Sequence, residues 1–137
     1  MNDCLEVCVG LGCDRGTSLA TLDQALSLAL ESLGLAQARI IRMASIDKKN
    51  DELGLLQLAE KNCVALMFYN AEQLAQVEVP SPSEVVRKYM GTPAVAEAAA
   101  LLSAGTTMKD LLLEKFKYKG ADGKNATVSI ARSCVGV

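Results

Sequence analysis

Residues 5–16 read LEVCVGLGCDRG, an apolar run that passes directly into a glycine-rich stretch. The run from Leu5 to Gly10 is short, β-branched and apolar, which predicts a strand that ends at glycine. The stretch from Gly10 to Gly16 interrupts regular structure, and a helical pattern begins after it, with Thr17 or Ser18 as a plausible N-cap. A strand, a glycine turn and a helix in this order predict the first unit of an α/β domain.

The same pattern continues along the chain. The first helix carries a stripe of leucines and ends at Gly34; its leucines are Leu19, Leu22, Leu26, Leu30 and Leu33. Strand 39–46 follows, then a polar loop, a helix over 51–62 and strand 64–69. This alternation of strands and helices predicts a parallel sheet whose strands are joined by right-handed crossovers. We expect strand 5–10 to lie between strands 39–46 and 64–69. The apolar composition of strand 64–69 favours a central strand covered on both faces.

The second half changes character. Its expected elements are a helical turn at 71–75, a helix from Ser83 to about Met90, a helix that restarts at Thr92-Pro93 and runs to about Ser103, and a hairpin of strands 111–118 and 126–133. In the second helix, Leu55, Leu56, Leu58 and Ala59 are expected to face inward. We therefore predict one α/β domain over residues 1–137: three layers, α/β/α, with a mixed sheet of about five strands, a parallel core and a C-terminal hairpin.

The composition is that of an ordinary globular protein, with 50% hydrophobic residues and a net charge of −2, but it contains no histidine. Catalysis by Ser-His-Asp or Cys-His and histidine-ligated metals are therefore excluded. The spacing of Cys4, Cys8 and Cys13 fits neither a zinc ribbon nor an iron–sulfur run, so we expect no metal site and no cofactor. Five cysteines without a secretory segment favour a cytoplasmic location, and no apolar stretch is long enough to span a membrane.

Basic residues are concentrated near the C-terminus. Residues 109–132 hold six lysines and arginines against three carboxylates, while the rest of the chain is acidic. Such a patch suits a polyanionic partner, although lysines also keep the edge of a hairpin soluble. The overall charge gives no general attraction to nucleic acid.

The glycine loop is the strongest local candidate for a binding site. Its candidate residues are Gly10, Gly12, Cys13, Arg15 and Gly16. Glycines allow a backbone to approach a ligand, a helix start offers N–H groups to an anion, and an arginine can add a charge-assisted contact. A dinucleotide-binding fingerprint would place its third glycine at position 15, so that function is disfavoured. A simple connecting turn is the alternative. For Cys13, burial is favoured over a nucleophilic role, because histidine is absent.

Two further clusters are expected near the same edge of the sheet. Asp47, Lys49 and Glu52 follow strand 39–46 and could position an acidic substrate or transfer protons, but a solvated loop explains them equally well. Ser83 and Thr92 cap helix starts that suit anions.

Glu97 is an acid within an alanine-rich helix. If it is buried it needs a partner or a raised pKa. We favour pairing with Lys49 or Arg15 over direct catalysis, with exposure to solvent as the alternative.

Five segments in this order resemble a known family: GLGCDRG, IDKKNDELGLLQLAE, PSPSEVV, MGTPAVAEAAAL and ATVSIAR. Together they are similar to the CobE family and the C-terminal domain of CbiG in cobalamin biosynthesis, over nearly the whole chain. Asp14 stands where many relatives have arginine, and Leu53 where proline is usual. Each segment alone is weakly specific, whereas the ordered set is specific.

The resemblance implies a protein of cobalamin (vitamin B12) biosynthesis that binds a corrin-ring or precorrin intermediate and helps to process or deliver it. One alternative is a lactone hydrolase of the cobalt-precorrin-5A type, which opens the ring A lactone and releases acetaldehyde. Another is a regulatory or docking module for a different enzyme of the pathway. The candidate ligand-binding residues above follow the family's motifs, and no catalytic residue is assigned.

Overall fold

The computed structural model describes residues 5–34, 38–77 and 93–133. The predicted helix from Ser83 to Met90 lies outside these residues. The elements are β1 (Glu6–Cys13), α1 (Leu19–Ser32), β2 (Arg39–Ile46), the 3₁₀ turn η1 (Asp47–Lys49), α2 (Leu53–Lys61), β3 (Ala65–Tyr69), α3 (Ala71–Ala75), α5 (Pro93–Ala104), the 3₁₀ turn η2 (Met108–Asp110), β4 (Leu111–Lys119) and β5 (Asn125–Arg132).

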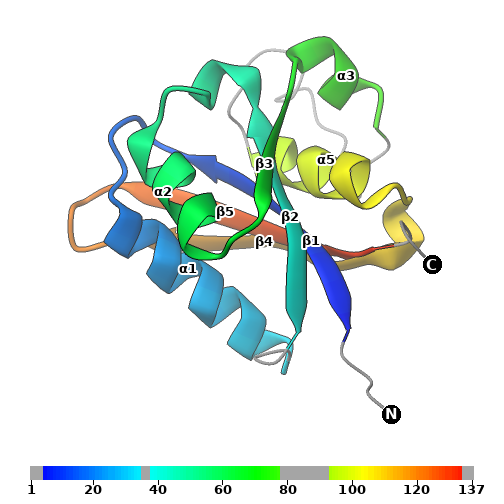
Figure 1. The fold of residues 1–137 in the computed structure, drawn as a ribbon, viewed down its shortest axis with the longest axis horizontal. Helices are drawn as coiled ribbons and strands as arrows, with labels where there is room; N and C mark the ends of the chain where they lie inside the picture. Colours follow the sequence, from blue (N-terminus) through cyan, green and yellow to red (C-terminus); the bar gives the residue numbers. More distant parts are fainter. Residues whose placement is uncertain (1–4, 35–37, 78–92, 134–137) are drawn as a thin grey trace.

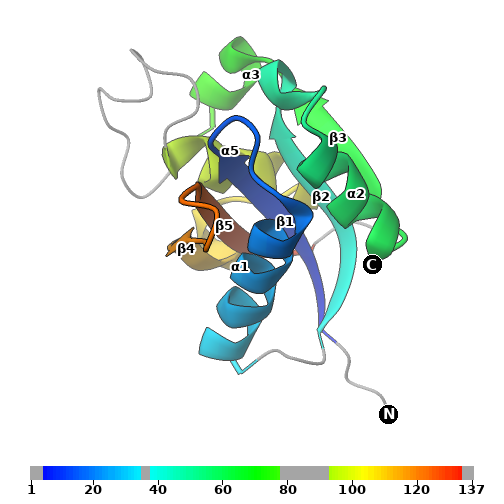
Figure 2. The same ribbon diagram turned by 90° about the vertical axis from the view of Figure 1, so that its left-hand side faces the viewer.

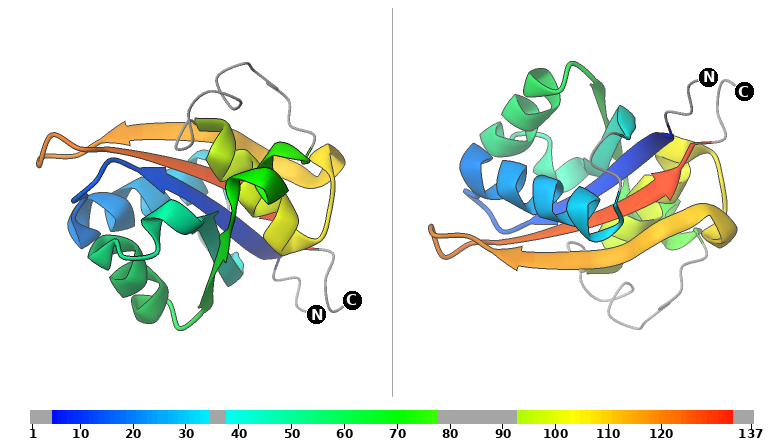
Figure 3. Two further views of the ribbon diagram at one scale, coloured as in Figure 1. Left: turned by 90° about the horizontal axis from the view of Figure 1, so that it is seen from above. Right: turned by 90° about the horizontal axis from the view of Figure 1, so that it is seen from below.

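The strands form one mixed sheet in the order β3-β2-β1-β5-β4. β1, β2 and β3 are parallel, and the β4–β5 hairpin joins antiparallel to β1. The predicted fold class is therefore confirmed: a five-stranded mixed sheet with a parallel core and a C-terminal hairpin, flanked by helices on both faces (Figures 1 and 3).

The predicted strand order within the parallel core is wrong. β1 does not lie between β2 and β3, because β5 pairs with its other edge from Val7 to Cys13. β3 is consequently an edge strand with Met67 37% exposed, although its sequence favours a covered one. The same pairing with β5 extends β1 as far as Cys13, three residues beyond the predicted end at Gly10.

α1 and α2 cover one face of the sheet. Ser18 caps α1 by accepting a hydrogen bond from the Thr21 amide, as one of the two predicted caps. Besides Ala25, Ala29, Ala59 and Ala126, the buried residues of this face are large and apolar: Val7, Val9, Leu11, Leu22, Leu26, Met43, Leu55, Leu58, Val128 and Ile130. Leu56 was predicted to face inward with its neighbours but is 39% exposed, because α2 buries the stripe of Leu55 and Leu58 instead.

α5 covers the other face, together with α3 (Figures 1 and 3). It lies against β1 at unusually close range: a Cβ atom on Gly10 would come within 1.9 Å of the Ala96 carbonyl oxygen. Only a glycine on the strand and alanines on the helix allow this approach. α5 runs antiparallel to β1, with Ala96 and Ala100 over Gly10 and Ser103 near Cys8, so it begins at the end of the sheet where β1 stops.

Candidate functional site

The carboxyl edge of the parallel strands gathers four segments of the chain. The loop after β1 meets η1 and the start of α2, and the β4–β5 hairpin lies beside the exit of β1 (Figure 2). α5 begins at the same edge. Carboxyl edges of parallel strands are where ligands of open α/β sheets bind.

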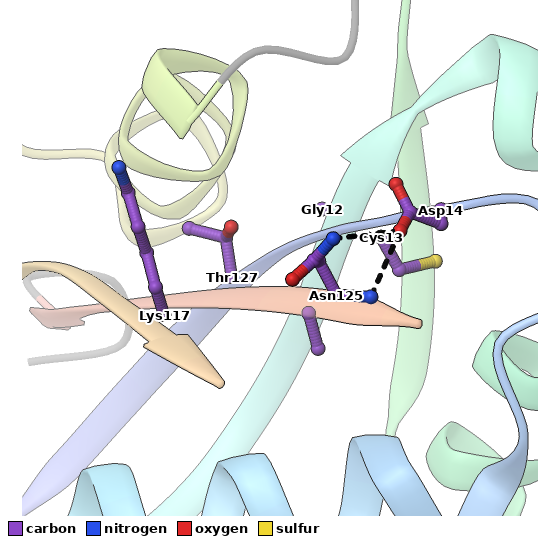
Figure 4. A pocket seen from close by; sticks show the side chains of 7 residues that line it. Gly12, Cys13, Asp14, Lys117, Asn125 and Thr127 are labelled. Atoms are coloured by element: carbon purple, nitrogen blue, oxygen red, sulfur yellow. Dashed lines mark hydrogen bonds between the residues drawn. The ribbon is translucent and has the colours of Figure 1, made fainter. Parts of the chain in front are cut away.

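A hollow of about 230 Å³ opens at the end of β1, between β1 and the hairpin. We call it the β1-exit hollow; it is lined by Gly12, Cys13, Asp14, Lys117, Asn125, Ala126 and Thr127. Lys117 and Thr127 are paired in the register of β4 and β5 and point to the same side, toward the start of α5 (Figure 4). Gly12 and Cys13 were predicted at a binding site, and both line this hollow.

Asp14 and Asn125 close one end of the hollow. The Asn125 amide and Nδ2 donate to Asp14 Oδ2 at 2.9 and 3.0 Å, and the Asp14 amide donates to the Asn125 carbonyl at 3.0 Å (Figure 4). These bonds tie the exit of β1 to the start of β5. Asp14 is thereby engaged, whereas Lys117 has neither an ion pair nor a hydrogen bond among residues 5–34, 38–77 and 93–133. Lys117 therefore borders the hollow as an exposed side chain without a protein partner among the described residues.

Arg15 lies on the other side of the loop and is held by protein groups. Its Nη1 atom lies 2.6 Å from Asp51 Oδ1 and 2.7 Å from Glu52 Oε2, and its Nη2 donates to the Lys48 carbonyl at 2.8 Å. The hydrogen bond from Arg15 lowers the pKa of Asp51. The Gly16 amide donates to Glu52 Oε1 at 3.0 Å.

The structure thus brings Arg15, Gly16 and Glu52 together as the sequence predicted, but in contact with one another. Glu52 is only 5% exposed and needs these donors. A ligand carboxylate at Arg15 would compete with two protein carboxylates for the guanidinium. The cluster therefore serves first to join the β1–α1 and β2–α2 loops.

Gly10 has a different role from the predicted one. It lies inside β1 and is covered by the backbone of α5, so a ligand cannot approach it. The physical reason for a glycine here is the packing of helix on strand, which a sequence pattern does not distinguish from a ligand-binding glycine.

Cys13 lines the hollow, and the charge of Lys49 acts on its thiol. Burial raises the pKa of the Cys13 thiol, while the charge of Lys49 lowers it in part. The thiol is therefore protonated at neutral pH, which agrees with burial rather than nucleophilic use. Asp47 is exposed at the start of η1. Ser83 and Thr92 lie outside the described residues.

Glu97 is fully buried on α5, with 0% of its surface exposed. Pairing with Arg15 is wrong, since Arg15 is held by Asp51 and Glu52, and Lys49 does not act on it. Neither of its oxygens has a hydrogen-bond partner among the residues that the structure describes. Burial raises its pKa to about 7, and the charge of Lys115 opposes this rise.

The prediction missed Asn125 and Thr127, and it placed Lys117 only within the basic patch. The available signal was the excess of lysine on strand 111–118, but pairing of the hairpin with β1 could not be read from it. Within the described part of the chain, no group of three or more cysteine or acidic side chains could hold a metal ion. No helix in that part is long and apolar enough to cross a membrane.

Comparison with known proteins gives a consistent result. The family model of the cobalamin synthesis G C-terminus matches residues 7–131. Cobalt-precorrin-5A hydrolase of Priestia megaterium is 32% identical over 123 residues, which are 90% of this chain and 31% of that protein. Protein CobE of a Sinorhizobium species is 35% identical over 71% of this chain and 64% of its own length. The chain therefore spans about a third of the hydrolase and about two-thirds of that CobE protein.

Solved structures agree with the sequence comparison. The crystal structure of CobE, a protein from the cobalamin biosynthetic pathway, superposes with a TM-score of 0.70 at 32% identity, covering 93% of this chain and 90% of that one. The cobalamin biosynthesis protein chiG from Agrobacterium tumefaciens gives a TM-score of 0.62 at 26% identity, over 93% of this chain and 98% of that one. On the match from residue 7 to residue 131 and on these relatives, the chain belongs to the family of the cobalamin synthesis G C-terminus.

Proposed function

We propose that this chain acts in cobalamin biosynthesis by binding a corrin-ring intermediate, one of whose carboxylate arms enters the β1-exit hollow. The observation that carries the proposal is Lys117, whose ammonium group lines the hollow without a partner among the described residues. Corrin intermediates are polycarboxylates, and a protein of net charge −2 needs a local cation to hold one. The relatives named for cobalamin biosynthesis support this ligand class.

The size of the hollow limits what enters it. About 230 Å³ is less than the roughly 300–1,000 Å³ of pockets that enclose a whole drug-sized ligand. A single acetate or propionate arm fits this volume, and the macrocycle would lie outside, across the carboxyl edge. There Lys49 lies near Cys13 and adds a second positive charge to the rim.

Binding is a better fit to the site than covalent chemistry. Burial keeps the Cys13 thiol protonated, and the buried Glu52 is committed to Arg15 and Gly16. The chain contains free thiols at Cys8, Cys13 and Cys63, which favour the cytoplasm as its place of action.

The sequence relationship favours a lactone hydrolase as a second candidate, because several relatives carry the name cobalt-precorrin-5A hydrolase. In that reaction water adds to the ester carbonyl and the ring C–O bond breaks, which leaves a carboxylate and a hydroxyl group. The step needs a base for the water and a donor for the oxyanion. Arg15 and Glu52, two residues suited to these roles, are paired with each other.

The binding proposal is tested by removing Lys117. We expect Lys117→Ala to weaken binding of cobyrinic acid, a corrin with free carboxyl groups, by roughly 10- to 100-fold, as for loss of a charge-assisted hydrogen bond. The matched control is Lys109→Ala, which removes the same charge at the opposite end of β4 and should leave affinity within about twofold. The methyl ester of the probe should bind wild type and Lys117→Ala alike. Equal losses in both variants would relocate the site.

The hydrolase candidate is tested by incubating the pure protein with a lactone-bearing precorrin. Mass spectrometry would detect the gain of one water when the lactone opens and the further loss of C2H4O when acetaldehyde leaves, and a coupled assay would detect the acetaldehyde. Turnover above the buffer rate establishes the hydrolase, whereas binding without turnover supports the first proposal. Affinity that appears only after another pathway enzyme is added would favour the docking role.

A further inference from the structure

Within residues 5–34, 38–77 and 93–133, Glu97 is the residue whose buried side-chain oxygens have no hydrogen-bond partner. Two serines on the same face of the sheet are also buried, but each donates to a carbonyl: Ser103 to Ala100 at 3.1 Å, and Ser129 to Glu114. Both carboxyl oxygens of Glu97 lack a hydrogen-bond partner among the described residues. A buried carboxyl without partners is much less costly when it keeps its proton than when it is ionised.

Among the residues that the structure describes, two charged groups act on Glu97, and both come from β4. Lys115 favours the ionised form of Glu97 and Glu114 disfavours it. The other titratable groups of the described elements that pack on α5 are not among the charges that act on Glu97. Cys8, Arg42 and Tyr69 interact with one another on the same face, and Glu72 of α3 is exposed. β5 contributes no titratable group beneath α5 other than the exposed Arg132 at its end.

The same strand connects Glu97 to the β1-exit hollow. The register of β4 and β5 shifts between Leu113 and Phe116, so strand alternation alone does not place Lys115. Lys117 points toward the start of α5 (Figure 4), and Lys115 acts on Glu97 of the same helix, which puts both lysines on the α5 face. Lys117 lines the hollow, and Lys115 interacts with Glu97. A negative charge on Glu97 would therefore attract Lys115 and lower the positive potential that an anion meets at Lys117.

We propose that Glu97 is a proton-binding residue that couples anion binding in the β1-exit hollow to pH. With its proton, Glu97 is neutral and leaves Lys115 and Lys117 available to an anion. Without it, the carboxylate draws Lys115 under α5 and weakens the hollow for anions. The proposal has two parts. The proton part, that Glu97 titrates near Lys115, concerns the free protein; the ligand part, that this titration changes anion binding, rests on the proposed function. Burial raises the pKa of Glu97 to about 7, which sets the transition near neutral pH.

The proton part is tested by NMR on the ligand-free protein. We expect the backbone amides of Lys115, Lys117 and Thr127 to shift together, with a midpoint at about pH 7. Glu97→Gln keeps the size of the side chain and should abolish this transition. Lys115→Met should raise the midpoint and Glu114→Gln should lower it, because these two side chains act on Glu97 in opposite directions. Opposite shifts in two variants that retain Glu97 are not expected of a purely structural residue. A transition that persists in Glu97→Gln overturns the proposal.

The ligand part is tested by the affinity for cobyrinic acid across the same pH range. We expect the wild type to lose affinity on the order of tenfold between about pH 6 and 8, as Glu97 loses its proton. Glu97→Gln should bind the probe with an affinity that does not depend on pH. Measurable binding that is pH-independent in wild type overturns this inference but leaves the proposed function standing. Absence of binding at every pH, with the NMR transition present, overturns the proposed function and leaves Glu97 as a proton site.

Discussion

The two faces of the sheet are packed with different kinds of side chain. Toward α1 and α2, the strands present Val7, Val9 and Leu11, which meet leucines such as Leu22 and Leu58. Toward α5, the buried residues are mainly alanines, and the helix approaches β1 at backbone distance over a glycine. Two carboxyl side chains are buried among the described residues. Glu52 lies in the loop cluster with Arg15, and Glu97 lies on this second face.

This difference separates stability from chemistry. Large aliphatic side chains bury the most apolar surface, at roughly 25 cal/mol per Å², so the α1/α2 face contributes more hydrophobic stabilisation. The small side chains on the α5 face bury less apolar surface and so contribute less stabilisation. They allow the start of α5, the β1-exit hollow and Glu97 to lie close together.

The largest effect is expected from a side chain on Gly10. Even a Cβ atom would lie 1.9 Å from the Ala96 carbonyl oxygen and 2.7 Å from the Ala100 amide nitrogen, and backbone of a helix cannot turn aside. Gly10→Val should therefore lower the free energy of unfolding by about 4 kcal/mol, at the upper end for overpacking. Urea denaturation measures this change.

Gly12→Ala is the matched control on the same strand. Its Cβ would find nothing closer than the Thr127 Cβ at 3.9 Å, so stability should change by less than about 1 kcal/mol. The added methyl group would narrow the β1-exit hollow. Similar destabilisation by both substitutions would show that the close approach of α5 to β1 is not as described.

On the α1/α2 face, the corresponding test removes a leucine from α2. Leu58 is fully buried, and Leu58→Ala should cost about 3 kcal/mol through lost burial and the cavity left behind. Leu56 on the same helix is 39% exposed, and Leu56→Ala should cost less than about 1 kcal/mol. Thermal and urea unfolding would measure both. Under conditions where Leu58→Ala is folded, it should bind cobyrinic acid as the wild type does. A changed affinity would contradict the inference that the α1/α2 face contributes stability and the α5 face contributes binding.

The sequence predicts local structure well here because the signals are local. β2 ends where its pattern predicts, Ser18 is a cap, and the leucine stripe of α1 faces the core. The order of the strands depends instead on which edge of β1 the hairpin takes, and that contact joins residues more than a hundred positions apart. β3 shows the consequence: an apolar sequence permits a central strand but does not require one.

The candidate site was likewise predicted where local signals decide it and was missed where contacts between distant residues decide it. The glycine loop and the segment after β2 are correctly brought to one edge, because the ends of parallel strands must meet there. Whether Arg15 contacts a ligand or Asp51 is decided by side-chain geometry, which spacing does not contain. Gly10 and Gly12 look alike in sequence, yet the first lies under a helix and the second beside a hollow.

Glu97 gives the α5 face a stability that falls as pH rises. Its folded-state pKa of about 7 lies above the usual 4.5, so the folded protein holds the proton more tightly than the unfolded chain. The contribution is complete below about pH 4.5 and is lost as pH rises through 7, at roughly 3 kcal/mol in total. Unfolding in urea at several pH values measures it, and Glu97→Gln should remove the dependence. Parallel pH profiles in the two proteins would contradict the raised pKa.

Asp122 gives the α1 side a dependence of the opposite sign, with the smallest expected effect. It lies in the hairpin turn, at the same end of the molecule as the start of α1 (Figure 3), where Oδ1 accepts from the Lys124 amide at 3.0 Å and Oδ2 from the Ser18 amide at 3.1 Å. These bonds lower its pKa to about 2 from the usual 3.8, so the folded state favours the carboxylate.

The stabilisation from Asp122 is therefore present above about pH 3.8 and disappears as pH falls through 2. Asp122→Ala should lower the melting temperature near neutral pH and should lose its difference from wild type at the acid end. Asp47→Ala is the control for the loss of a carboxyl as such, because it removes an exposed carboxyl that makes no side-chain hydrogen bond among the described residues. Since Glu97 loses its contribution with rising pH and Asp122 with falling pH, the variant lacking both, Glu97→Gln with Asp122→Ala, should have a flatter pH–stability curve than wild type. A double variant whose curve kept the shape of the wild type would show that neither face owes its pH dependence to these two carboxyls.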